Sequence, residues 1–540
     1  MRRQTIAALV ALGLALPANG CSFLRDFDDF EAGGMCAPGM TDCDPSVEGC
    51  ETNLDTSRDH CGACGRTCDV TDFCAAGSCQ QYQAQLAATG SFEGVLYPPR
   101  VAPALDGGVF VALSHTTPLR LSGLTDPIAP SSRDIAVARY QNDGALNWVV
   151  AANGASVETV FSVASVPDPA DPNDELIAMG GQFRSEPMTL TSATGDPVEV
   201  SPSTAGSSDG ILWVLDRAGE HRWHAHFKGE NVQSVRQVVA DTDGNLFVAG
   251  WFAGSELMID ESADLSEGIT GGIFIAKFLP NGARAWEKVF DAQLGIFQSM
   301  AADRAGGVYL FSASNAEITI DGTPSVGNST PRLIHLEADE GKVDWFETYS
   351  AAEPASEGEP GVAVTPDGRV FIAFHPDDDS SAIGDFLLER GVTVAEVDPD
   401  DEGRPLAARQ FGGTVEPVDL QADGDGNLVL AGEALEPTLD FGGGEIMRPD
   451  PNDTDVVLIG MDADLEYRWA RVFGQVSDPD AGTMDTSELL DGLAMDAAGR
   501  VYAGGRFEHD FEVDGLPLTY DDVVGEGAAW VLRLDPIAVD

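Results

Sequence analysis

Two short stretches of the chain carry oxygen ligands at alternate positions, as the start of a calcium loop does. The alternating residues are Asp241, Asp243 and Asn245 in one stretch, and Asp423, Asp425 and Asn427 in the other. A complete EF-hand loop also needs Gly at its sixth position and Glu at its twelfth, and both stretches have other residues there. Asp, Gly and Asn are also the residues that tight turns require. The sequence therefore leaves two interpretations open: a Ca²⁺ site or a backbone turn.

Three of the eight histidines lie close together, at His221, His224 and His226. Residues two apart in a β-strand share a face, so His224 and His226 form a candidate pair of metal ligands. No carboxylate at a fixed offset completes a site. The alternative interpretation is a partly exposed strand face with no ion.

Eight cysteines are clustered near the N-terminus, and none follows them: Cys36, Cys43, Cys50, Cys61, Cys64, Cys68, Cys74 and Cys79. An even, tightly clustered set in an exported chain predicts a small module held by four disulfides, because so short a segment cannot bury an adequate core. Their connectivity is left open. The pair Cys61-x-x-Cys64 beside His60 also has zinc spacing, but export and the lack of a second such pair favour disulfides.

The N-terminus has the pattern of an export signal. A basic start is followed by an apolar run from Ile6 to Leu16 and by small residues before Cys21. This pattern predicts a signal peptide over residues 1–20. No later segment is apolar for long enough to span a membrane as a helix. Residues 21–35 form an acidic stretch that we expect to be a flexible linker.

The charge balance limits the partners. The chain has 89 acidic and 30 basic residues, for a net charge of −59. Such a field repels nucleic acid and anionic membrane surfaces and attracts cations or basic partners. The sequence contains no G-x-S-x-G, no H-E-x-x-H and no phosphate-binding glycine loop. No catalytic residue is predicted.

Sequence repeats indicate which elements position these residues. In residues 235–290, a short apolar strand is followed by a D-G-N turn, a second strand, a variable loop, a third strand, an N-G turn and a fourth strand. The first-turn glycine recurs six times, each time two residues before a Val or Leu: Gly107, Gly244, Gly306, Gly368, Gly426 and Gly499. The second unit is irregular and uses the turn at Asn173–Leu176 instead, which brings the number of units to seven. Such repetition predicts a β-propeller with seven blades.

The fourth strands show how the ring closes. A Gly four residues before a Trp marks most of them, as at Gly144 and Trp148, and six units have a fourth strand at this spacing. The seventh unit ends after its third strand, while residues 81–88 resemble an unpaired fourth strand. We therefore predict that this N-terminal strand completes the last blade and protects its edges.

The repeated tryptophans have a packing interpretation. Because they recur at one position of the repeat, packing between blades explains them better than a ligand platform does: Trp148, Trp223, Trp286, Trp345 and Trp469. Trp251 stands outside the pattern, late in a second strand, and is the better candidate for a functional surface.

Three parts of the chain resemble known families: the N-terminus, the cysteine-rich segment and the repeats. Cys21 lies where bacterial lipoproteins carry their acylated cysteine, which implies a lipid anchor, and Ser22 implies outer-membrane sorting; cleavage that leaves Cys21 as an unmodified N-terminus is the alternative. Residues 49–68 resemble the cysteine-rich segment of myxobacterial surface proteins. The stretches 243–250, 275–290 and 439–444 resemble bacterial seven-bladed propeller repeats, which share a fold but no single reaction.

These observations predict an all-β protein with four parts: a signal peptide (1–20), an acylated cysteine with a linker (21–35), a disulfide-rich module (36–79) and a seven-bladed propeller (80–540). We expect an exported, monomeric, lipid-anchored protein of the outer membrane or cell surface. Its propeller would act as a binding or scaffold module for a protein, a glycan or cations, with Ca²⁺ as the candidate cofactor. The alternative is an extracellular hydrolase or lyase with acidic residues at the channel mouth.

Overall fold

The structure is a computed structural model of the whole chain. It describes residues 36, 39–43, 50, 52–69, 71–91, 99–204, 206–266, 268–292, 299–312, 318–320, 323–325, 331–349, 360–376, 382–388, 391–412, 415–434, 436–448, 454–474, 489–507, 511–518 and 528–539. The predicted signal peptide, Cys21 and the predicted linker lie outside these residues. No helix in the described ranges is long and apolar enough to cross a membrane.

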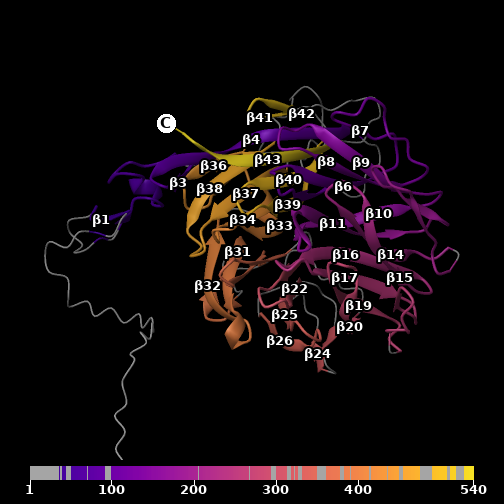
Figure 1. Cartoon of the computed structure of the whole chain (residues 1–540). Helices are drawn as coiled ribbons and strands as arrows, with labels where there is room; N and C mark the ends of the chain where they lie inside the picture. The colour runs from indigo at the N-terminus through magenta and orange to yellow at the C-terminus, as the bar shows by residue number, and fades with distance from the viewer. Residues whose placement is uncertain are drawn as a thin grey trace, which may run out of the picture.

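Seven antiparallel sheets of the described strands are arranged as a ring, and each forms one blade (Figure 1). The strands of each blade are given from the innermost outward. The first blade has β5 (Arg100–Pro103), β6 (Val109–His115), β8 (Asp134–Tyr140) and β9 (Leu146–Asn153), and the second has β10 (Glu158–Asp168), β11 (Asp171–Phe183), β14 (Asp209–Asp216) and β15 (His221–Lys228). The third has β16 (Val232–Ala240), β17 (Leu246–Ala253), β19 (Gly271–Phe278) and β20 (Arg284–Ala292), and the fourth has β21 (Ser299–Ala302), β22 (Val308–Ser312), β25 (Arg332–Leu336) and β26 (Val343–Thr348).

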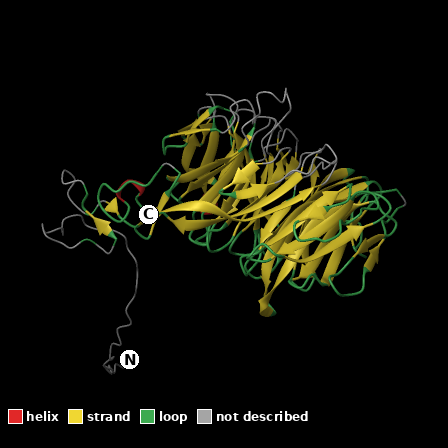
Figure 2. Cartoon of the chain, turned by 90° about the horizontal axis from the view of Figure 1, so that it is seen from above, coloured by secondary structure: helices red, strands yellow, loops and turns green. Residues whose placement is uncertain are grey.

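The fifth blade has β27 (Gly361–Val364), β28 (Val370–Phe374), β31 (Val392–Asp398) and β32 (Arg404–Phe411). The sixth has β33 (Val415–Ala422), β34 (Leu428–Ala434), β37 (Asp455–Met461) and β38 (Tyr467–Phe473). The seventh has β39 (Leu489–Met495), β40 (Val501–Phe507), β43 (Ala528–Ala538) and β4 (Ser78–Ser91). Each innermost strand contacts that of the next blade, and β39 contacts β5, so the circle is complete. Seen from above, strands make up most of the ring (Figure 2).

The N-terminal strand closes the ring as predicted. β4 pairs antiparallel with β43 from Gln80↔Ala538 to Ser91↔Ala528. In Figure 1 the indigo β4 lies beside the yellow β43, so the two ends of the chain form one sheet. The prediction of a seven-bladed propeller closed by strand exchange is confirmed, and the strand is longer than residues 81–88.

The repeated glycines adopt the backbone conformation that the tight turns require. Gly107, Gly244, Gly306, Gly368, Gly426 and Gly499 all have positive φ, between 76° and 93°. Other residues rarely adopt this region because their Cβ clashes with the backbone. The following strands begin two residues later, as at Val109 and Leu246, which explains why the glycines mark the repeat so regularly.

Four blades pack their tryptophan against the turn of the next blade. The indole Nε1 of Trp148 donates to the Arg217 carbonyl, and a Cβ added at Gly219 would lie 2.9 Å from the Trp148 ring. Likewise, a Cβ added at Gly282 would lie 2.8 Å from the Trp223 ring. The Gly-to-Trp spacing within one blade thus reflects contacts between neighbouring blades, and the packing interpretation of the repeated tryptophans is confirmed.

Insertions between second and third strands cover the outer edges of preceding blades. Four of them add a strand to the preceding fourth strand: β7 (Arg120–Leu121) on β4, β12 (Met188–Leu190) on β9, β18 (Met258–Ile259) on β15 and β23 (Ile318–Ile320) on β20. Hairpins extend two of these additions, through β13 (Val198–Val200) and β24 (Thr323–Ser325). The remaining described insertions are separate hairpins: β29 (Ala382–Ile383) with β30 (Phe386–Leu387), β35 (Thr438–Asp440) with β36 (Glu445–Met447), and β41 (Phe511–Val513) with β42 (Leu516–Leu518).

The cysteine-rich segment forms a small module with four disulfides. The pairs are Cys36–Cys50, Cys43–Cys64, Cys61–Cys74 and Cys68–Cys79. Its elements are β1 (Met40–Thr41), β2 (Thr52–Asn53), β3 (Phe73–Ala75) and the 3₁₀ turn η2 (Arg58–His60); the propeller has a second such turn, η3 (Pro399–Asp401). β3 pairs with β4, so the module and the last blade share a sheet.

Candidate functional site

The proposed calcium ligands lie in two first turns, where the oxygens of the leading Asp already accept hydrogen bonds. Asp241 Oδ1 accepts hydrogen bonds from the backbone N–H of Asp243 (3.0 Å) and Asn245 (2.9 Å), and Asp241 Oδ2 accepts from the Asn245 side-chain amide (2.7 Å). An Asp that bonds the backbone two and four residues on stabilises such a turn by itself. These contacts account for the pattern without an ion, and Ca²⁺ at this turn stays a prediction.

The second turn has the same hydrogen bonds and also a neighbouring arginine side chain. Asp423 accepts the same three hydrogen bonds, from the backbone of Asp425 and Asn427 and from the Asn427 side chain. The Arg468 guanidinium donates to Asn427 Oδ1. A positive charge on this oxygen competes with a metal ion for it.

The histidine strand shows an arrangement that simple alternation did not predict. A bulge between Val214 and Leu215 in the register of β14 with β15 leaves one extra residue in β15. His221 consequently faces the same side as His224, and their Nε2 and Nδ1 atoms lie 3.2 Å apart. His226 is nearly buried and its Nε2 lies 2.7 Å from Asp209 Oδ2. The closest histidine pair is therefore His221 with His224, and His226 is held by a carboxylate.

The cysteines form the one cluster of three metal-ligating side chains in the described ranges. The sulfur atoms of Cys61, Cys68 and Cys79 lie within 4.8 Å of one another. All three belong to disulfides, and a thiolate is the form of cysteine that binds a metal. The structure therefore agrees with the disulfide interpretation of this segment rather than with the zinc alternative.

Trp251 lies near an aromatic and cationic cluster formed by the innermost strands of two blades. The Arg236 guanidinium on β16 lies 3.8 Å from the ring centre of Phe161 on β10 and 5.7 Å from that of Trp251. Both β10 and β16 are innermost strands, which border the channel of a propeller. Each has a bulge at the same place in the repeat, next to Phe161 and Arg236 respectively. Sequence reasoning singled out Trp251 and missed Arg236, whose type alone gives no signal.

A buried acid lies between the first two blades. Glu158 at the start of β10 is fully buried, and its Oε1 accepts a hydrogen bond from the Ser185 N–H at 3.1 Å. Burial raises the pKa of Glu158 to about 7, and the nearby Asp134 adds to the rise. A carboxyl group with such a pKa can hold or release a proton near neutral pH.

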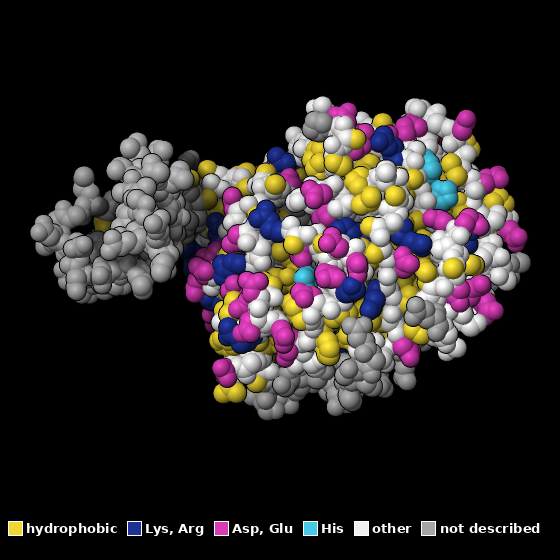
Figure 3. Space-filling view, turned by 60° about the horizontal axis from the view of Figure 1, so that its bottom comes forward, with side chains coloured by type: hydrophobic (Ala, Val, Ile, Leu, Met, Phe, Trp, Pro, Cys, Tyr) yellow, Lys and Arg dark blue, Asp and Glu magenta, His cyan; other side chains and the backbone are white. Residues whose placement is uncertain are grey.

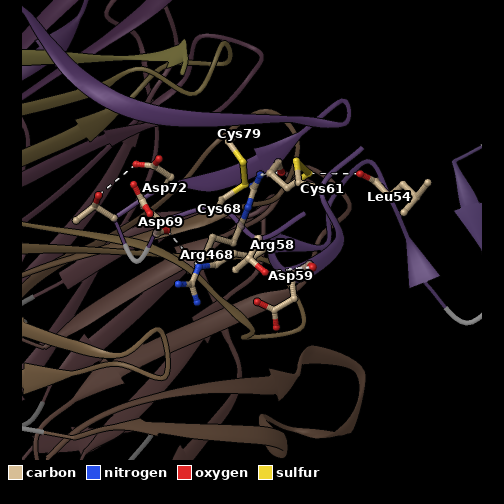
Figure 4. Close-up of a disulfide and its surroundings, with 12 residues drawn as sticks. Leu54, Arg58, Asp59, Cys61, Cys68, Asp69, Asp72, Cys79 and Arg468 are labelled. Atoms are coloured by element: carbon tan, nitrogen blue, oxygen red, sulfur yellow. Dashed lines mark hydrogen bonds between the residues drawn. A yellow bond between two sulfur atoms is a disulfide. The ribbon is translucent and has the colours of Figure 1, made fainter. Parts of the chain in front are cut away.

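The disulfide module is fastened to the last two blades. Arg58 Nη2 donates to the Gly443 carbonyl at 3.1 Å, and Arg468 Nη2 donates to the Cys74 carbonyl at 3.4 Å. Figure 4 shows Arg58 and Arg468 beside the Cys68–Cys79 disulfide. Tyr82 on β4 packs on Trp469, with ring centres 4.3 Å apart, and donates to the Gly499 carbonyl. The module is thus part of a continuous packed structure.

The surface is strongly acidic but carries scattered cations. Figure 3 shows acidic side chains distributed over the visible face of the ring, with basic side chains between them and a few histidines at the surface. Many of the basic side chains pair with carboxylates, such as Arg369 with Glu396 (2.7 Å) and Arg222 with Asp168 (3.1 Å). These basic side chains neutralise part of the acidic surface locally, but the chain as a whole keeps a net charge of −59.

The fold defines this chain as a seven-bladed β-propeller with an N-terminal disulfide-rich segment. No protein-family model matches the chain, and no curated protein matches it. Among solved structures it is similar to the Dos1 propeller (10% identity, 84% of this chain and 95% of that chain, TM-score 0.39). It is also similar to Sqt1 from Chaetomium thermophilum (11%, 85% and 100%, 0.37) and to the phage phi92 endosialidase (10%, 86% and 70%, 0.36).

Proposed function

We propose that this protein is an exported, lipid-anchored surface protein whose propeller is a rigid binding or scaffold module. The observation that carries the proposal is the shared strand: β4 contains Cys79 of the disulfide module and also closes the ring. An anchor at Cys21 would therefore hold the ring through a packed module. This matches the lipoprotein and myxobacterial resemblances of the N-terminal sequence.

The ligand class follows from the charge. A ring with this excess of acid attracts cationic protein surfaces and metal ions, and it repels nucleic acid and anionic lipid. We propose a protein, glycan or cation ligand at the cell surface, with the membrane contacted through the lipid alone. The long insertions between second and third strands provide loops for such contacts, because loops carried on a rigid scaffold often bind ligands.

The anchor is tested by acyl labelling of the exported protein in a bacterial host. We expect the full-length chain to incorporate a labelled fatty acid and to fractionate with the outer membrane. The Cys21→Ser variant should lose both the label and the membrane fraction. The matched variant Ser22→Asp should keep the label and move to the inner membrane. A wild-type chain that takes no label would contradict the lipid anchor.

The binding role is tested separately with the purified full-length protein as bait for cell-envelope extracts, with and without Ca²⁺. A saturable ligand that is retained at physiological salt would support the role. We expect binding of basic ligands to weaken as salt rises, because surface charges are screened over about 8 Å at physiological ionic strength. Turnover of a glycan or polymer, abolished by the substitution Glu158→Gln, would contradict the non-enzymatic role.

A further inference from the structure

Two histidines on the outer strand of the second blade lie close enough to ligate one ion. His221 and His224 belong to β15, and the bulge at Arg222 brings them to one face although they are three residues apart. Their rings contact each other at 5.4 Å between centres, tilted by 54°. Both side chains are partly exposed, so an ion can reach them from solvent.

The separation of the nitrogen atoms fits a shared metal ion. His221 Nε2 and His224 Nδ1 are 3.2 Å apart. Two Zn–N bonds of about 2.0–2.1 Å across this separation enclose an angle of roughly 100°, close to tetrahedral. Without a metal, the same atoms share one proton in an N–H···N hydrogen bond. For binding, this proton moves to the other nitrogen of the same ring, and the two rings turn so that both lone pairs point at the ion.

An acidic side chain near the pair favours a bound cation. Asp260 directly follows β18, the strand that pairs with β15, and its negative charge acts on His224. It is exposed, and its Oδ1 accepts from the His226 N–H at 2.9 Å. It therefore favours a cation near the pair without occupying the site.

We propose that His221 and His224 form a two-histidine site for a divalent transition-metal ion such as Zn²⁺ or Cu²⁺. Imidazole nitrogen suits these ions, whereas Ca²⁺ and Mg²⁺ prefer oxygen. Water or a ligand's own donor atom completes the coordination, so the ion can bridge the ring to a partner. His226 is excluded from the site because Asp209 holds its Nε2 in the interior. The proposal does not depend on the lipid anchor.

Isothermal titration of the purified full-length protein without a histidine tag tests the site. Zn²⁺ is added in the presence of excess Ca²⁺, which saturates carboxylate sites. We expect one Zn²⁺ to bind per chain, and His221→Ala and His224→Ala each to weaken binding by at least about tenfold, or ~1.4 kcal/mol. The control variant His60→Ala removes a histidine of the distant disulfide module and should bind as the wild type does.

A spectroscopic measurement separates ligation from a structural effect. With Cu²⁺ in place of Zn²⁺, electron paramagnetic resonance should show coupling to two nitrogens in the wild type, to one nitrogen in either single variant and to none in His221→Ala/His224→Ala. Thermal midpoints without metal should be equal among these proteins, because both rings are partly exposed. Unchanged Zn²⁺ affinity in the double variant, or a wild type that binds no Zn²⁺, would overturn the proposal.

Discussion

At the scale of single residues, the most informative position is one where the repeat is broken. The third turn of a blade normally has a glycine that packs against the tryptophan of the preceding blade; at Gly403, for example, an added Cβ would lie 2.7 Å from the Trp345 ring. The fifth blade has Ala407 in place of tryptophan, and the following turn has Leu465 in place of glycine. Leu465 has φ 62° and is almost fully buried in the cluster that Ala407 contacts. We infer that its side chain takes the place of the missing indole in this cluster.

This exchange predicts strong coupling between Ala407 and Leu465. The substitution Leu465→Gly relieves a left-handed backbone that costs about 1–2 kcal/mol, but it empties a core position worth about 2–5 kcal/mol. We expect a net loss of roughly 1–3 kcal/mol in the free energy of unfolding. Ala407→Trp alone should also destabilise, because Leu465 fills the site. Denaturant unfolding of both single variants and of the double variant forms the test.

The double variant restores the regular Gly-and-Trp arrangement, so its loss should be smaller than the sum of the single losses by about 1 kcal/mol or more. Additive losses would show that the two positions are independent. The matched pair Trp345 and Gly403 in the preceding blade offers a control, since Gly403→Leu should clash there with no compensating space.

A second residue-level prediction concerns Glu158. Its pKa of about 7 in the folded protein exceeds the ordinary value of 4.5 because the side chain is buried. The folded state therefore holds the proton more tightly than the unfolded state does, and the resulting stability is lost as the pH rises from the ordinary value to about 7. The substitution Glu158→Gln retains an acceptor for the Ser185 N–H and cannot ionise. Relative to wild type, this variant should gain more stability at about pH 8 than at about pH 5, by at most about 3 kcal/mol.

Thermal unfolding at both pH values measures this difference. Asp134 also lies near Glu158, but its oxygens accept hydrogen bonds from the backbone N–H groups of Ser131 and Gly154. The stability of Asp134→Asn at the same two pH values therefore serves as the comparison. Equal stability differences for Glu158→Gln at the two pH values would mean that Glu158 stays ionised or protonated throughout.

At the scale of elements, the insertions between second and third strands join neighbouring blades. Thr189 and Leu190 of β12 pair with Asn153 and Ala152 of β9, and Thr191 Oγ1 accepts from the Ala151 N–H at 2.8 Å. Such additions satisfy the outer edge of a blade that would otherwise expose unpaired backbone groups. The hairpin β35–β36 of the sixth blade forms a sheet of its own, meets the preceding blade through the single bridge Gly412↔Asp440, and leaves Met447 81% exposed.

This difference predicts unequal effects of equivalent truncations. Leu190 is fully buried against the first blade, so Leu190→Ala should cost about 2–5 kcal/mol. The exposed Met447→Ala should change the free energy of unfolding by no more than about 0.5 kcal/mol. Chemical denaturation of the two variants compares them directly. Equal losses would mean that the added hairpin contributes no more to the fold than an exposed one does.

These additions also show where sequence reasoning ends. The glycines and the alternation of apolar residues predicted the blades, because every blade repeats the same turns. The added strands are only two or three residues long, as in Met258–Ile259, and lie in loops of variable length, so no period reveals them. The pairing of His221 with His224 was missed for a similar reason, since one bulge shifts the alternation on which the prediction relied.

At the scale of the whole molecule, two contacts close the ring. The fourth strand of the last blade is β4, and β7 from the first blade pairs with the far end of β4 at Gly90↔Leu121 and Ser91↔Arg120. The closing strand is therefore held on one side by the C-terminal strand and on the other by the next blade. Aromatic packing of Tyr82 between Phe73 and Trp469 joins the same strand to the disulfide module.

This arrangement predicts that β4, rather than the disulfide module, maintains the closed ring. A chain that begins at residue 99 lacks both parts, and its β43 becomes an open edge whose buried side chains, such as Trp530 and Leu532, lose their cover. A matched chain that begins at Ser78 and carries Cys79→Ser keeps β4 without the module. We expect the first chain to unfold at a clearly lower temperature and to be cut faster by protease near its C-terminus. The second chain should lose only the contacts of Phe73, Arg58 and Cys74 and stay close to the full-length protein. Equal thermal midpoints and protease resistance for the two truncated chains would show that closure does not depend on the exchanged strand.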